Sequence, residues 1–335
     1  MANRPTARDS AADPHPPSME PAPRELIVVA NRDAGLRSQQ TTISSITGTD
    51  VSDLAKVLQN AGATITPLFG DSEERLQQER ATMAADMPGG DTEPFDELPD
   101  LSVYYHVDAA DNVLDELASE LVKCRSVESA YVKPPTYLSQ QVAVSGAAGS
   151  GAEAINAMRS LEVDAPPVTA DFTARQGYLG PAPGGIDALY AATVPGGRGL
   201  GVGIIDIEGA WRFSHEDLRQ NQGGVAAGTL SNDLGWRNHG TAVIGVFGGD
   251  RNGLGITGIA PDARTRGISI FGATGTAGAI RQAAQLSGKG DIILIELHRP
   301  GPRFNFGAPQ GQRGFVAIEW WPDDFAAVRY AVMRG

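Results

Sequence analysis

Two short, almost uninterrupted apolar runs constrain the fold of this chain more than any other feature. Residues 200–206 read LGVGIID, and residues 291–297 read DIILIEL. A strand that is apolar on both faces must be covered on both faces, which is typical of parallel sheets whose strands are joined by helices. Around these two strands we expect a third strand at residues 264–270 and helices at residues 240–248, 277–286 and 324–333. The pattern predicts an α/β unit with a parallel sheet over residues 168–335.

The first part of the chain has a different order of elements. Strands are expected at residues 26–30, 63–69, 101–107 and 127–132, and helices at residues 51–61, 71–84 and 109–122. Without the charged helix at 71–84 and the acidic insertion at 87–100, the order is strand–helix–strand–strand–helix–strand. This order is typical of a ferredoxin-like α+β fold and predicts a domain over residues 25–135. Residues 136–167, which contain the run SGAAGSG, are predicted to be a flexible linker, and the Pro-rich residues 1–24 a disordered tail.

Composition excludes several classes of function. The net charge of -13 argues against a nucleic-acid partner, because binding to phosphates requires a basic surface. Cys124 is the only cysteine, so neither an intrachain disulfide nor a thiolate metal cluster can form, and its place at the end of an expected helix indicates a buried structural thiol. The sequence has no apolar run long enough for a secretory signal or a membrane span. As written, it predicts no membrane partner and a cytoplasmic location.

Two side chains stand where catalytic groups collect in an α/β sheet. Asp206 follows a buried strand, and the carboxyl ends of such strands form the edge at which ligands bind. His239 precedes an expected helix, and Gly240 permits close approach of the backbone there. A carboxylate that orients an imidazole and stabilises the imidazolium supplies two parts of a nucleophilic triad. Glu208 lies next to this pair and is expected to point into solvent.

Here a resemblance to the subtilisin-like serine proteases (subtilases, peptidase family S8) becomes specific. The segments that carry it, in the order of that family, are Gly203-Ile-Ile-Asp206, Ser214-His-Glu-Asp-Leu218, Asn238-His-Gly-Thr241, Gly258-Ile-Ala-Pro-Asp262 and Asp291-Ile-Ile-Leu-Ile-Glu-Leu297. The resemblance implies a serine endopeptidase with a peptide or protein substrate, Asp206 as orienting acid and His239 as general base. Residues 25–135 are similar to the propeptides of the family, which implies that this part is the chain's own intramolecular inhibitor, so that the whole is a zymogen.

Two departures from the family pattern affect the expected activity. At the cleft strand, Glu296, Leu297 and His298 replace small residues, so these substrate-binding positions predict a preference for basic or polar side chains before the cleaved bond. No Gly-Thr-Ser-x-Ala segment follows His239. The only later serines, Ser269 and Ser287, are expected in a core strand and at a helix end. We therefore expect the sequence to stop before the nucleophile and to be inactive as it stands.

Other functions remain open at this stage. A non-catalytic pseudoprotease or binding module would also lack the serine. The Gly-rich run at residues 272–278 lies between a strand and a helix, where a nucleotide phosphate could bind, although its spacing departs from the usual motif. No His-x-x-x-His pair is present, so no catalytic metal is predicted. No cofactor is expected either, and calcium bound by loop carboxylates is left open.

Overall fold

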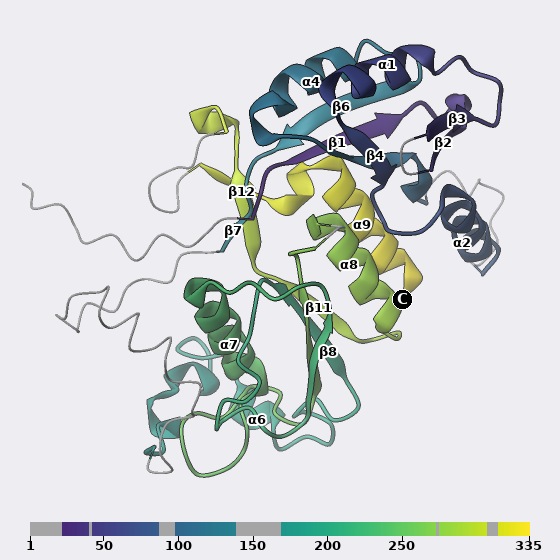
Figure 1. Ribbon diagram of the computed structural model, residues 1–335. Helices are drawn as coiled ribbons and strands as arrows, with labels where there is room; N and C mark the ends of the chain where they lie inside the picture. Colours follow the sequence, from purple (N-terminus) through teal and green to yellow (C-terminus); the bar gives the residue numbers. More distant parts are fainter. Residues whose placement is uncertain (1–21, 40–41, 87–97, 139–168, 273–274, 307–313) are drawn as a thin grey trace, which may run out of the picture.

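The computed structural model shows an N-terminal part and a C-terminal part joined by a packed interface (Figure 1). The structure describes residues 22–39, 42–86, 98–138, 169–272, 275–306 and 314–335. Most of the expected disordered tail, linker and acidic insertion therefore lies outside the described residues, although residues 22–24 of the tail are described. Within the described residues, no helix combines the length and the apolar character needed to cross a membrane.

The N-terminal part is built on an antiparallel four-stranded sheet. Its strands are β1 (Glu25–Ala30), β4 (Thr64–Pro67), β5 (Tyr104–Asp108) and β6 (Val127–Lys133), in the order β4-β5-β1-β6. Helices α1 (Ser52–Ala61) and α4 (Leu114–Leu121) cover one face, where Leu54 and Leu117 enter a core with Leu26. Cys124 is buried in this core, as expected. These helices and strands were all predicted, because each carries apolar residues at the period of its own structure.

A hairpin and a charged helix complete the N-terminal part. Strands β2 (Leu36–Gln39) and β3 (Thr42–Ser45) pair antiparallel, and this hairpin was not predicted because its residues are mostly polar. Helix α2 (Glu73–Asp86) begins two residues after the expected start.

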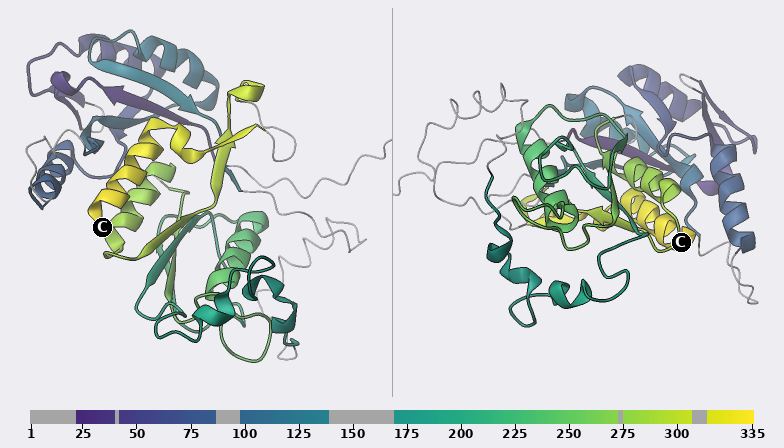
Figure 2. Two further views of the ribbon diagram at one scale, coloured as in Figure 1. Left: turned by 180° about the vertical axis from the view of Figure 1, so that it is seen from behind. Right: turned by 90° about the horizontal axis from the view of Figure 1, so that it is seen from below.

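The C-terminal part contains the predicted parallel sheet. Its strands are β8 (Gly203–Glu208), β9 (Gln222–Ala227), β10 (Arg264–Ser269) and β11 (Ile292–Ile295), in the order β11-β8-β10-β9. Helix α7 (Leu234–Gly248) lies on one face, while α8 (Gly275–Leu286) and α9 (Pro322–Arg334) lie side by side on the other (Figures 1 and 2). Both faces of the sheet are thus covered, which explains why the apolar runs are nearly continuous. Strand β9 was not predicted.

The run at 291–297 is not one strand, as predicted, but two. It breaks at Glu296, so that β11 ends at Ile295 and β12 (Leu297–Pro300) leaves the parallel sheet. Strand β12 pairs antiparallel with β13 (Phe315–Ala317) on one side and with β7 (Tyr137–Leu138) on the other. Strand β7 lies within the predicted linker, so the start of that segment is ordered.

Helices α8 and α9 lie between the two sheets (Figure 1). Ile27 of β1 shares one core cluster with Ala277 of α8 and Ala327 of α9, and these small side chains allow the helices to approach the antiparallel sheet closely. The remaining short helices are α6 (Ala188–Ala191) and the 3-10 turns Arg32–Ala34, Leu101–Val103, Asp111–Val113, Thr173–Arg175, Gly177–Leu179, Pro302–Phe304 and Ile318–Trp320.

Candidate functional site

The site begins at the carboxyl end of β8. This strand runs two residues beyond its predicted end, because Ile207 and Glu208 continue the parallel pairing with Ile268 and Ser269 of β10. Side chains on a strand alternate between its faces. Ile207 packs into the core that contains α8, so Asp206 and Glu208 face the opposite side, where α7 lies.

Helix α7 brings His239 to that side of the sheet. The carboxylate of Asp233 caps the helix by accepting from the backbone N–H groups of Gly235 and Trp236, at 2.7 and 3.3 Å. The helix therefore begins before the predicted start at Gly240, and His239 lies within it. A Cβ atom on Gly240 would lie 2.4 Å from the carbonyl oxygen of Ala210, so only glycine lets α7 come this close to the chain that leaves β8.

The imidazole of His239 contacts a carboxylate from β8, but that carboxylate is Glu208. Nδ1 of His239 and Oε1 of Glu208 are joined by a hydrogen bond of 2.7 Å. Both side chains are buried, so the expectation that Glu208 points into solvent is wrong. Asp206, the acid predicted for this contact, instead accepts a hydrogen bond of 2.7 Å from Nε1 of Trp211.

Of the three predicted substrate-binding residues, Glu296 lies on the other side of the imidazole. Oε2 of Glu296 is 3.9 Å from Nε2 of His239, and the Glu296 side chain is 39% exposed. Leu297 pairs with Leu138 of β7, and His298 with Tyr137. The structure thus brings Glu296 to His239 and places Leu297 and His298 on the strand that leads away from it.

Burial and crowding of negative charge dominate the electrostatics of the site. Burial, and then the negative charge of Glu208, raise the pKa of Asp206 well above its ordinary value. The pKa of Glu208 is raised to about 9, mainly by burial and to a smaller extent by the negative charge of Glu296. Oδ1 of Asp206 and Oε2 of Glu208 have no hydrogen-bond partner among the described residues. At neutral pH, the cluster therefore holds more protons than its groups would hold in water.

The same cluster contains a set of groups that could hold a metal ion. Glu208, His239 and Glu296 each offer one ligand atom, and these atoms lie within 4.8 Å of one another. A histidine with two carboxylates suits a divalent cation such as Zn²⁺. The short bond between Glu208 and Nδ1, however, is the arrangement that orients an imidazole for proton transfer from Nε2.

Neither of the two later serines is presented to His239. The hydroxyl of Ser269, at the end of β10, donates to the carbonyl oxygens of Gly209 and Thr229, at 3.0 and 2.6 Å. Ser287 follows α8, and that helix lies on the face of the sheet opposite to α7.

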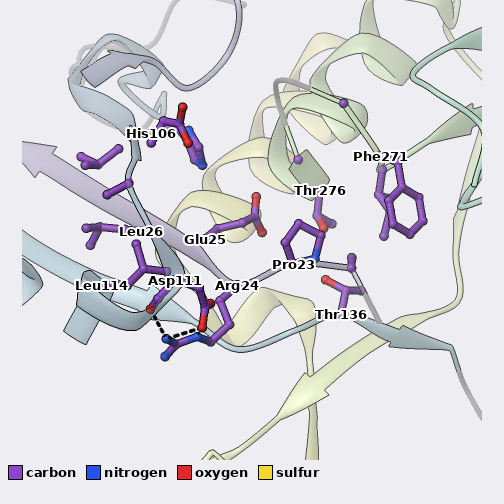
Figure 3. A pocket seen from close by; sticks show the side chains of 17 residues that line it. Pro23, Arg24, Glu25, Leu26, His106, Asp111, Leu114, Thr136, Phe271 and Thr276 are labelled. Carbon is purple, nitrogen blue, oxygen red and sulfur yellow. Dashed lines mark hydrogen bonds and ion pairs between the residues drawn. The ribbon is translucent and has the colours of Figure 1, made fainter. Parts of the chain in front are cut away.

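The Gly-rich run considered for nucleotide binding leads into α8. Residues 273–274 lie outside the described residues, and the helix begins at Gly275. A Cβ atom on Gly275 would lie 1.9 Å from Oε1 of Glu25, so a carboxylate of the N-terminal part occupies the place where a phosphate would bind. A cavity of about 260 Å³ adjoins this point, between β1 and the start of α8, and Glu25, His106 and Thr276 line it (Figure 3). The cavity does not include His239.

Comparison with known proteins adds little to this geometry. No known family profile matches the sequence, and no curated protein matches it. One similar solved structure is that of fervidolysin from Fervidobacterium pennivorans, described as a keratinolytic enzyme related to subtilisin. The two are 13% identical with a TM-score of 0.42, over 96% of this chain and 40% of that protein. This chain thus spans well under half of fervidolysin, and a likeness of this degree carries no argument about activity.

Proposed function

We propose that this chain carries the acid–base pair and the inhibitory segment of a subtilisin-like serine endopeptidase. The observation that carries the proposal is the 2.7 Å hydrogen bond between Glu208 and Nδ1 of His239. In this assignment, Glu208 orients the imidazole, and Nε2 accepts the proton of a serine hydroxyl as that oxygen attacks the peptide carbonyl. Glu208, which must be ionised for this role, then stabilises the imidazolium, which returns the proton to the leaving amine. Because the pKa of Glu208 is raised to about 9, turnover should increase as the pH rises towards that value. Asp206 supports the site through its bond to Trp211 and is not the orienting acid.

The pairing of β7 with β12 supports the proposed inhibitory role of the N-terminal part. An extended peptide that binds at the edge of a sheet gains main-chain hydrogen bonds, and β7 makes this kind of contact with Leu297 and His298. His298 also stacks on Phe315 with ring centroids 3.8 Å apart, which holds the outer side of the strand. In this proposal, β7 occupies the place of a substrate. The strand order of the N-terminal part also fits the predicted ferredoxin-like propeptide.

Glu296 suggests the class of substrate. It is the first residue before β12, its carboxylate faces Nε2 of His239, and it is partly exposed. A peptide that lies along β12 would place a side chain near this carboxylate, and a Lys or Arg side chain would be favoured there. Equal cleavage of peptides with basic and apolar residues at this position would contradict the assignment, and Glu296→Gln should abolish any preference.

The test of the proposed function is peptide hydrolysis by the protein as it occurs in the cell. His239→Ala should abolish turnover, and Glu208→Gln should lower kcat/KM on the order of 10⁴-fold. Asp206→Asn should cause a much smaller loss, because it removes a bond to Trp211 and not to the base. If Asp206→Asn lowered kcat/KM more than Glu208→Gln does, Asp206 would be the orienting acid. Binding of extended peptides without hydrolysis would favour the binding-module alternative.

A further inference from the structure

A second cluster of charged side chains is buried between the N-terminal and C-terminal parts. Glu25 of β1 and Lys133 of β6 come from the N-terminal part. Arg299 of β12 and the neighbouring Asp323 and Asp324 of α9 come from the C-terminal part. None of the five residues is more than 8% exposed. We call this cluster the charge junction.

Each cation of the charge junction binds groups from both parts. Nζ of Lys133 lies 2.5 Å from Asp323, 2.9 Å from Asp324 and 3.4 Å from Glu25. The guanidinium of Arg299 binds the carboxylate of Glu25 and the carbonyl oxygen of Pro134, and its Nε is 3.8 Å from Asp324. Separation of the two parts would therefore break every pair that crosses the interface.

The junction does not balance its own charge. Three carboxylates face two cations, so the fully ionised cluster carries one net negative charge inside the protein. An uncompensated buried charge is strongly unfavourable, and one proton on a carboxyl removes it. Other titratable groups that face the junction are His106 and Tyr104 of β5 and Tyr131 of β6. Protonated His106 would add a positive charge beside Glu25. Like a proton on a carboxyl, this charge would reduce the net negative charge of the junction.

Asp324 is the carboxyl that holds this proton. Its Oδ2 has no hydrogen-bond partner among the described residues. Burial raises the pKa of Asp324 to about 7. Against the effect of burial, Lys133 and Arg299 lower the pKa of Glu25 to about 2, so Glu25 remains ionised. Asp324 is thus the group that titrates near neutral pH.

We propose that the charge junction is a pH-dependent lock between the two parts, closed while Asp324 carries a proton and weakened once all five groups are ionised. Asp324 binds its proton more tightly in the docked state than when exposed to water. The docked state therefore receives this stabilisation in full below the ordinary pKa of 3.8 and loses it as the pH rises from there to about 7. The lock concerns docking and is independent of hydrolysis. Its consequence for activity, the release of β7 from β12, rests on the proposed function.

Hydrogen–deuterium exchange of the full chain, corrected for the intrinsic pH dependence of exchange, tests the lock. Amides of β6 and the start of α9 should be most protected below about pH 4, their opening should rise by up to about tenfold per pH unit between about pH 4 and 7, and it should level off above about 7. Asp324→Asn should keep them protected in alkaline solution. Asp323→Asn also balances the charge of the junction and should do the same. Exposed Glu319 lies on a neighbouring turn, and Glu319→Gln should leave the wild-type profile unchanged.

Two results would overturn the proposal. One is a wild-type profile without a rise in opening between about pH 4 and 7. The other is a rise that persists in both Asp324→Asn and Asp323→Asn. The exchange experiment does not depend on peptide hydrolysis, so failure of the lock and failure of the proposed function are separate outcomes.

Discussion

Glu208 and His239 are 31 residues apart in the sequence, yet Oε1 of the first lies 2.7 Å from Nδ1 of the second. Strand β8 supplies the carboxylate and helix α7 the imidazole, and the two elements pack on each other. The opposite nitrogen of the ring, Nε2, faces Glu296 at 3.9 Å. The imidazole is thus held between two carboxylates of different exposure, one buried and one partly open to solvent.

Stability should fall as the pH rises, because of Glu208. Its pKa is raised from 4.5 to about 9 in the folded protein. A group that binds its proton more tightly when folded stabilises the protein fully below 4.5, and this contribution is lost as the pH rises towards 9. The slope should approach about 1.4 kcal/mol per pH unit at most. Thermal unfolding as a function of pH should show a shallower decline in Glu208→Gln, and an identical decline would contradict the raised pKa.

Removal of the charge of Glu296 should lower the pKa of Glu208. Burial is the larger cause of the raised pKa of Glu208, and the negative charge of Glu296 is the second cause. In Glu296→Gln, the Glu208–His239 pair should therefore lose its proton at lower pH, and histidine NMR of the ring protons would follow that midpoint. Glu116→Gln, at an exposed position on α4, removes the same charge far from the site and should not move the midpoint. A midpoint that is the same in both variants would show that Glu296 has no effect on the pair.

A methyl group on Gly240 should disrupt the approach of α7 to β8. A Cβ atom there would lie 2.4 Å from the carbonyl oxygen of Ala210, which is backbone and cannot turn away. Gly240→Ala should therefore lower the free energy of unfolding by at least about 2 kcal/mol. Gly253 has nothing within 4 Å of the corresponding position, so Gly253→Ala is the matched control with little change. Denaturant unfolding of both variants would check this, and equal stabilities would argue against the tight contact.

A charge in β7 should free the edge of β12. Leu138 is 2% exposed and pairs with Leu297. Leu138→Asp would place a carboxylate in this apolar position, so β7 should detach and β12 should bind an added extended peptide more tightly than in the wild type. Fluorescence anisotropy with a labelled peptide measures this binding. Ile46→Asp, at a position that is 65% exposed, is the control. Unchanged peptide binding in Leu138→Asp would mean that β7 does not block this edge.

The sequence by itself determined the elements with a strong period. The apolar runs around Ile205 and Ile293 predicted buried parallel strands. Four of the six predicted helices formed within two residues of their expected bounds, while α7 begins six residues before its expected start and α4 five residues after it. His239 was predicted beside the carboxyl end of β8, but with Asp206 as its acid, whereas the structure pairs it with Glu208. The polar hairpin of β2 and β3 and the strand β9 gave no such signal.

Only the tertiary structure decided which acid meets His239. Asp206 and Glu208 are two positions apart on one strand and share a face, so the period of the strand cannot choose between them. The choice depends on how far along β8 the helix α7 lies, and Gly240 and the cap at Asp233 set that position through contacts that are not local. The pairing of β7 with β12 and the charge junction are likewise long-range contacts, and their residues carry no periodic pattern from which such contacts could be inferred.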